Sequence, residues 1–245
     1  MKKIFLLSYL TLSPIILFSQ TNCQLLFGLD GGLTYSNIIE KNDFPGNYDF
    51  KTGYSAGLNL ELIFRSRISL ETNIAFYQNG FNNNYRSTLV TNNYYATKSY
   101  LGFDYNVTQN YLNNSWLIGY HIGNKFDFSI YAGLYWSLFL KSKRKGKDYI
   151  YTDPNEWIEI ADPAIPLGYK ETLVSETISD EIYTNIDFGL VGKIMVGYNI
   201  NEKFKIICFM KYYKGLTDID KKVYLKDVEN YNNSVNFGLG FKMKL

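Results

Sequence analysis

The chain has 245 residues but only 2 cysteines, 1 histidine and 5 prolines. Cys23 and Cys208 are too few for a disulfide framework, and they lack the spacing of metal ligands. Beyond the N-terminal region, no apolar stretch approaches the roughly 18 residues that a membrane-spanning helix needs. These shortages exclude a disulfide-stapled domain, a helical membrane span and a Cys/His metal centre. No cofactor is expected.

The first residues have the layout of a secretory signal peptide. A basic start, Met1-Lys2-Lys3, precedes an apolar run from Ile4 to Phe18, and the small residue Ser19 closes it. We expect residues 1–19 to be the signal peptide and residues 20–245 to be one exported domain. Loss of Lys2 and Lys3 reduces 25 basic residues to 23, which match 23 acidic residues. The net charge therefore gives no argument for nucleic acid as a partner.

Aromatic residues are abundant, at 18% of the chain with 23 tyrosines. Aromatics favour strands, and a low proline content leaves the ladders of a sheet intact. Apolar and polar residues alternate with a period of two, which is the pattern of a strand. Eight such runs are present: 27–36, 54–62, 68–77, 112–122, 126–138, 186–199, 204–213 and 235–245.

The connections between these runs alternate in length. Short ones lie around Ser66, Asn124 and Glu202, and long ones cover about 39–51, 81–110, 142–182 and 216–232. Short periplasmic turns, long extracellular loops and an even strand number are typical of outer-membrane barrels. The sequence predicts an all-β fold, an eight-stranded antiparallel up-and-down transmembrane β-barrel of OmpA/OmpX-like architecture, in the bacterial outer membrane.

One face of the runs is almost free of charge, and the other carries acids and lysines. In a membrane barrel the charged face lines the lumen, which eight strands leave narrow enough for side chains to fill. Buried charges need partners, so we expect a lumen charge network of Asp30, Glu61, Glu71, Asp127, Asp187, Lys193, Lys205 and Lys211. For Glu61 and Glu71 at the first short turn, Arg65 and Arg67 are the nearest candidate partners in the sequence.

Two alternatives to a non-enzymatic membrane barrel remain open. A lipid A-modifying or lipid-hydrolysing enzyme would need a base, and His121, the one histidine, lies at the periplasmic end of its run with Ser69 or Ser129 as candidate partners. No catalytic residue is assigned, because a structural role for His121 fits the pattern better. A soluble periplasmic lipocalin-like carrier would instead turn the apolar face inward.

A basic run opens the third long loop. Lys141, Lys143, Arg144, Lys145 and Lys147 are candidates for contact with lipopolysaccharide phosphates, an anionic lipid or a partner, and a solvated loop base is the equal alternative. The Asn- and Tyr-rich loop 81–110 has the chemistry of a recognition surface for an unknown protein. Outer-membrane lipids and, during assembly, the barrel-insertion machinery are further expected partners.

Three segments resemble the PorT-like outer-membrane β-barrel proteins of Bacteroidota. They are Tyr111–Gly123, Tyr212–Ile219, which contains Tyr-Lys-Gly-Leu-Thr-Asp-Ile, and Phe237–Leu245. The run at 112–122 departs from the family by having Asn114-Ser115-Trp116-Leu117 in place of its usual Ile-Pro-Leu-Leu. The resemblance implies an eight-stranded barrel with no catalytic residues to carry over, and it implies protein secretion as a role of some members.

Overall fold

The computed structural model describes residues 23–40, 47–90, 98–152, 169–178, 184–219 and 229–245. All of its regular elements are strands: β1 (Gln24–Glu40), β2 (Asn47–Ile63), β3 (Ile68–Val90), β4 (Lys98–Ile122), β5 (Phe126–Thr152), β6 (Tyr169–Ile178), β7 (Ile186–Asn199), β8 (Phe204–Gly215) and β9 (Asn230–Lys244). Among these residues there is no helix of the length and apolarity that crossing a membrane requires. The expected signal peptide at 1–19 lies outside the described residues.

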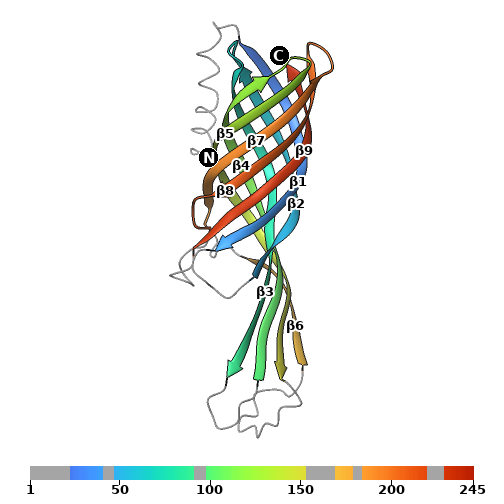
Figure 1. Ribbon diagram of the computed structural model, residues 1–245. Coiled ribbons are helices and arrows are strands. Elements are labelled where there is room, and N and C mark those ends of the chain that lie inside the picture. Colours follow the sequence, from blue (N-terminus) through green and yellow to red (C-terminus); the bar gives the residue numbers. More distant parts are fainter. Residues whose placement is uncertain (1–22, 41–46, 91–97, 153–168, 179–183, 220–228) are drawn as a thin grey trace.

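Eight strands close into a ring, in which each strand is antiparallel to its neighbours. The ring runs β1-β2-β3-β4-β5-β7-β8-β9 and closes through the pairing of β1 with β9. Figure 1 shows the barrel, with the C-terminus at the end that also carries the short turns. The predicted eight-stranded antiparallel barrel is confirmed.

Three tight turns join β2 to β3, β4 to β5 and β7 to β8, where the sequence predicts them. The first places Arg67 at a φ of 66°, and the second places Gly123 at a φ of 101°. A positive φ suits glycine and is unusual for arginine. We call the end of the barrel that carries these three turns the turn end.

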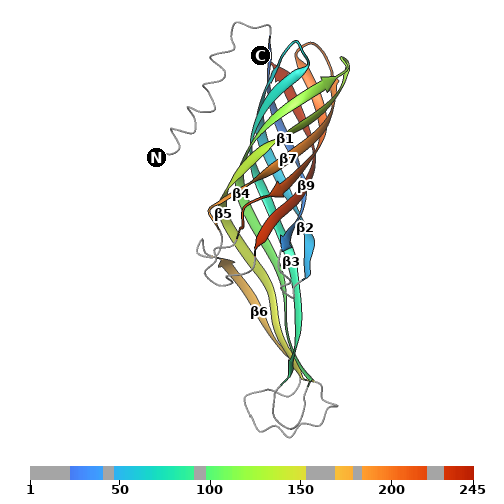
Figure 2. The ribbon, with the colours of Figure 1, turned by 60° about the vertical axis from the view of Figure 1, so that its left-hand side comes forward.

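The opposite end differs from the prediction. The segment 81–110, expected as a loop, is mostly strand, since β3 and β4 pair without interruption from Ile68 and Tyr120 to Val90 and Lys98. Likewise, β5 continues to Thr152 and pairs with a ninth strand, β6, inside the expected loop 142–182. Strands β3 to β6 thus extend well beyond the barrel as a narrow sheet (Figures 1 and 2). We call this sheet, which consists of the parts of β3, β4, β5 and β6 outside the barrel, the extension. Its residues lack the alternation of apolar and polar side chains that a lipid-facing strand has, so the extension was not predicted from the sequence.

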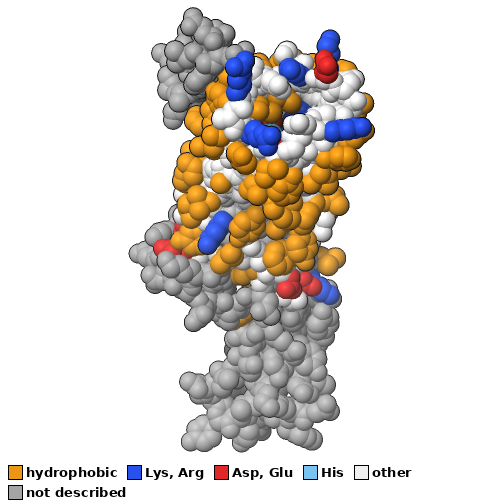
Figure 3. All heavy atoms as spheres, turned by 45° about the horizontal axis from the view of Figure 1, so that its top comes forward, with side chains coloured by type: hydrophobic (Ala, Val, Ile, Leu, Met, Phe, Trp, Pro, Cys, Tyr) orange, Lys and Arg blue, Asp and Glu red, His pale blue; other side chains and the backbone are white. Residues whose placement is uncertain are grey.

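Side-chain alternation turns the apolar face outward. Leu29, Ile118, Ile130, Leu190 and Phe237 are about half exposed or more on the outer wall. Figure 3 shows hydrophobic side chains covering the visible wall, with most of the visible basic side chains near the end that has the short turns. A soluble carrier needs the reverse arrangement, so that alternative is wrong for this fold.

Candidate functional site

The lumen near the turn end holds a continuous chain of ion pairs and hydrogen bonds. Lys205 binds Asp127 at 2.6 Å, and Asp127 binds Nδ1 of His121 at 2.8 Å. Nε2 of His121 lies 2.9 Å from Glu61, which also binds Lys242 at 2.7 Å. Lys242 continues to Glu71 at 2.8 Å, and Glu71 binds Lys193 at 2.7 Å. These residues come from β2, β3, β4, β5, β7, β8 and β9, so the chain ties nearly the whole ring together.

A second ion pair lies farther along the lumen. Lys211 on β8 donates to Oδ2 of Asp30 on β1 at 2.9 Å. The amides of Asn59 and Asn73 donate to the same oxygen at 3.3 and 3.1 Å. Asp30 therefore has a charged and two neutral donors in a site with almost no exposed surface, as a buried carboxylate requires.

The structure brings seven of the eight expected lumen charges into ion pairs and leaves Asp187 apart. Asp187 accepts hydrogen bonds from Tyr135, Thr217 and Asn232 at 3.2, 3.1 and 2.9 Å. Among the described residues, it has no lysine partner. Lys242 and His121 also belong to the network and were not predicted as members, although the alternation of their strands places both on the inward face.

The expected partners of Glu61 and Glu71 were wrong. Arg65 and Arg67 are exposed on the turn between β2 and β3, whereas Lys242 and Lys193 neutralise the two carboxylates from across the lumen. The physical reason is that inward side chains meet across the narrow ring, while turn residues face water.

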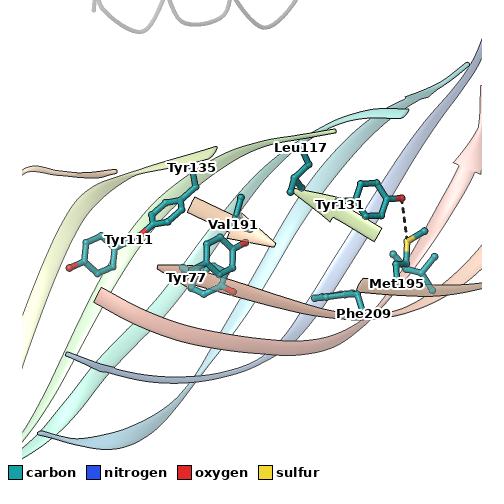
Figure 4. Packing of buried hydrophobic residues seen from close by; sticks show 11 residues of the cluster. Tyr77, Tyr111, Leu117, Tyr131, Tyr135, Val191, Met195 and Phe209 are labelled. Carbon is teal, nitrogen blue, oxygen red and sulfur yellow. Dashed lines mark hydrogen bonds between the residues drawn. The ribbon is translucent and has the colours of Figure 1, made fainter. Parts of the chain in front are cut away.

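Aromatic side chains fill the lumen beyond the charges. Tyr77, Tyr111, Tyr131, Tyr135 and Tyr213 are buried there with the apolar residues Ala75, Leu117, Val191, Met195, Ile207 and Phe209. Figure 4 shows several of these side chains pointing into one cluster, with the hydroxyl of Tyr131 directed at the sulfur of Met195. The same hydroxyl donates to Glu61 at 2.8 Å, so the aromatic and charged layers are joined.

A small cavity lies among Tyr77, Tyr111, Tyr135, Tyr213 and Asp187. Its volume is about 10 Å³, which is space for about one water molecule. This cavity therefore has no room for a solute larger than water.

His121 has the partners of a Ser-His-Asp triad, but the histidine and both serines are buried. Its Nε2 lies 3.1 Å from the hydroxyl of Ser69, and its Nδ1 is held by Asp127. Ser129 lies 2.9 Å from Nδ1, on the same nitrogen as Asp127. Ser69 and Ser129 have no exposed surface, and Glu61 competes for Nε2. The arrangement is therefore a buried network and offers no accessible nucleophile.

The basic run lies on β5, where that strand leaves the barrel. Lys141, Lys143 and Lys145 are exposed, and Lys147 is partly buried. Arg144 is also partly buried, with its guanidinium 4.5 Å from the ring centre of Tyr105. The run is thus divided between the two faces of the strand. Among the described residues, no cluster of three or more His, Cys, Asp or Glu side chains could hold a metal ion.

Comparison with known proteins points to one family. A family model described as outer membrane protein beta-barrel domain matches residues 18–221. No curated protein matches the chain.

Solved structures similar to this chain include small outer-membrane proteins of other bacteria. Neisserial surface protein A is 9% identical with a TM-score of 0.40, over 89% of this chain and 97% of that one. OprG of Pseudomonas aeruginosa is 13% identical with a TM-score of 0.42, over 92% and 98%. The outer membrane protease OmpT of Escherichia coli is 8% identical with a TM-score of 0.40, over 91% and 97%.

Proposed function

This chain belongs to the family of outer membrane protein β-barrel domains, and we propose that it is a non-enzymatic barrel that carries a recognition sheet outside the bacterial cell. The proposal rests on the difference between the filled lumen and the sheet that extends beyond the barrel. The lumen is filled by ion pairs and tyrosines, while β3, β4, β5 and β6 continue beyond the barrel as a paired sheet. The barrel then serves as an anchor, and the extension serves as the working part.

The filled lumen argues against transport and catalysis as the main role. The best candidate nucleophile, Ser69, has no exposed surface, and His121 is buried. An enzyme acting on outer-leaflet lipid would need its catalytic groups at the extracellular rim, whereas His121 sits beside the periplasmic turn, where its backbone N–H donates to Arg67.

One face of the extension has the chemistry of a binding surface. Tyr85, Phe103 and Tyr105 form a row of stacked rings, with centroid distances of 5.2 and 4.7 Å. Arg144 packs on Tyr105, and Asp148 accepts a hydrogen bond from its hydroxyl. Aromatic side chains held in place lose little entropy on binding, so a row of this kind suits recognition of a protein.

A more specific role follows from the resemblance to PorT-like barrels. On that basis we propose assistance to protein secretion in a bacterium of the Bacteroidota, with export directed by a signal peptide at residues 1–19. The apolar alternation of β9 up to Leu245 is what the barrel-insertion machinery would read.

The test separates the anchor from the extension. Residues 83–105 and 144–176 are each replaced by an Asn-Gly turn, which preserves the flanking pairs Asn82–Asn106 and Lys143–Thr177. A second variant keeps the extension but changes Tyr85, Phe103 and Tyr105 to serine. The measurement is cross-linking on intact cells with a reagent that does not cross the membrane.

We expect the native chain to give a discrete cross-linked complex and both variants to lose it, while all three still show heat-modifiable migration on gels. Loss of the complex in the trimmed variant alone would move recognition away from the aromatic row. An unchanged complex in the trimmed variant, or none with the native chain, would contradict the proposal.

A further inference from the structure

The alternation of β5 changes phase at the edge of the barrel. Within the barrel, even-numbered residues such as Ile130 and Leu134 face outward. The pairing of β4 with β5 shifts between Asn110 and Tyr111, which lie opposite Lys141 and Phe139, so that Leu140 is an extra residue. A bulge of one residue moves the following side chains to the other face. Beyond it, Lys141, Lys143 and Lys145 are exposed on the outer surface. We call these three residues the lysine row.

The lysine row begins where the apolar wall ends. Leu140 is the last apolar residue of β5 before the row and is 48% exposed. Alternate residues of a strand are about 6.6 Å apart, so the row covers about 13 Å along β5. In an outer-membrane barrel, the zone directly outside the hydrocarbon layer on this side is that of the outer-leaflet headgroups.

On the described strands no acidic residue lies directly opposite the lysine row, and the nearest acid on this face of β4 is Asp104, opposite Lys147. On β4, Lys141, Lys143 and Lys145 pair with Asn110, Thr108 and Asn106. On β6, Lys143 pairs with Thr177 and Lys145 with Ser175. All these partners are neutral hydrogen-bonding residues. Directly opposite side chains on one face lie within contact distance, so the β4 partners and Ser175 can share a bound anion with the lysines.

A further lysine binds the β4 partners of the lysine row. The ammonium of Lys51 on β2 passes Gly80 and donates to Oδ1 of Asn106 at 2.5 Å, to the carbonyl of Val107 at 3.0 Å and to the hydroxyl of Thr108. Its charge therefore lies beside the partners of Lys143 and Lys145. A side chain on Gly80 would obstruct that path, since an added Cβ would meet both Lys51 and the carbonyl of Val107.

We propose that the lysine row binds the phosphate groups of the glycolipid in the outer leaflet. The inference rests on the proposed orientation of the barrel, with β3 to β6 outside the cell. Ammonium groups make strong charge-assisted hydrogen bonds to phosphate oxygens, and three of them at regular spacing on one face match a layer of phosphates better than a flexible loop would. Arg144 is not part of this site, because its side chain packs over Tyr105.

The experiment compares two variants with the same loss of charge. The test variant carries K141Q, K143Q and K145Q. The matched control carries K125Q, K203Q and K244Q, which remove three exposed lysines at the periplasmic end. Each folded protein in detergent is titrated with phosphorylated lipid A and, separately, with lipid A from which the phosphates have been removed. Heat-modifiable migration verifies folding, and the single variant K143Q replaces the triple one if the latter does not fold.

The native protein and the control should prefer the phosphorylated form by about tenfold or more, because one hydrogen bond to a charged group corresponds to roughly that factor. The test variant should lose this preference. Equal preference in the test variant and the control would overturn the proposal, as would the absence of any preference in the native protein. A test variant that keeps its lipid preference but loses the cross-linked complex would mean that the row binds an anionic protein instead.

Failure of this inference can be told apart from failure of the proposed function. The trimmed variant described above retains Lys141 and Lys143 while losing the rest of the extension. If it keeps the preference for phosphorylated lipid A and loses the complex, both proposals stand. If the native protein forms no complex but prefers phosphorylated lipid A, only the recognition sheet is wrong.

Discussion

Substitution of Glu71 by glutamine tests the lumen network most severely. Glu71 has no more than 2% exposure and accepts two hydrogen bonds from Lys193, both at 2.7 Å, and one from Lys242 at 2.8 Å. Glutamine removes the charge while keeping the shape. Lys193 then has no carboxylate partner, and Lys242 keeps only Glu61.

The expected cost follows from leaving an ammonium buried and unpaired. Removing one partner of a buried ion pair lowers the free energy of unfolding by about 3–5 kcal/mol. The matched control is Asp187→Asn, where the carboxylate accepts hydrogen bonds from the neutral donors Tyr135, Thr217 and Asn232. No charged partner is stranded there, so a cost of about 1 kcal/mol is expected.

The assay is reversible denaturant unfolding in lipid vesicles, followed by the fluorescence of Trp116 and Trp136 on the barrel wall. A double variant, Glu71→Gln with Lys193→Met, also removes the stranded ammonium and should be more stable than Glu71→Gln alone. Equal losses for Glu71→Gln and Asp187→Asn, or no recovery in the double variant, would refute the view that paired charges hold the lumen together.

Other predictions concern the packing and closure of the lumen. Gly119→Ala should lower the free energy of unfolding by about 1–3 kcal/mol, because its methyl group would overlap the ring of Tyr131. Gly31→Ala should be tolerated in the same unfolding assay, since the nearest atom to its added Cβ is 3.5 Å away; similar losses for both would argue against a tightly packed lumen. In planar bilayers the native protein should give no steady ionic conductance, because ion pairs and tyrosines fill the lumen, and a stable ohmic current would contradict the filled lumen.

The strands inside the barrel were predictable because their two faces have different surroundings. Lipid on one side and a narrow polar lumen on the other impose strict alternation, as in Phe204 to Tyr213 on β8. The same alternation assigned the inward face to the charged residues. It could not assign their partners, since Lys242 and Glu71 are separated by 171 positions and meet only through the closure of the ring.

The extension was not predictable in the same way. Both faces of the extension lie outside the barrel wall. Segments such as Phe81–Tyr85 therefore carry polar residues on both faces, and their sequence predicts a loop. Backbone pairing and the stacked rings of Tyr85, Phe103 and Tyr105 hold these strands together, although no regular alternation of apolar and polar residues marks them in the sequence. The bulge at Leu140 was also missed, and with it the outward direction of the lysine row.

The central claim is that the apolar wall of the barrel faces lipid and that the charged side chains fill a closed lumen. Nitroxide labels on β8 test it directly, using the native Cys208 after Cys23→Ser, and Ile207→Cys or Phe209→Cys in a chain without other cysteines. Cys208 is exposed on the wall, whereas Ile207 and Phe209 are buried inside. In lipid vesicles, position 208 should be accessible to oxygen but not to a water-soluble nickel complex, and positions 207 and 209 to neither. High nickel accessibility at 207 or 209, or oxygen accessibility greater there than at 208, would contradict the account.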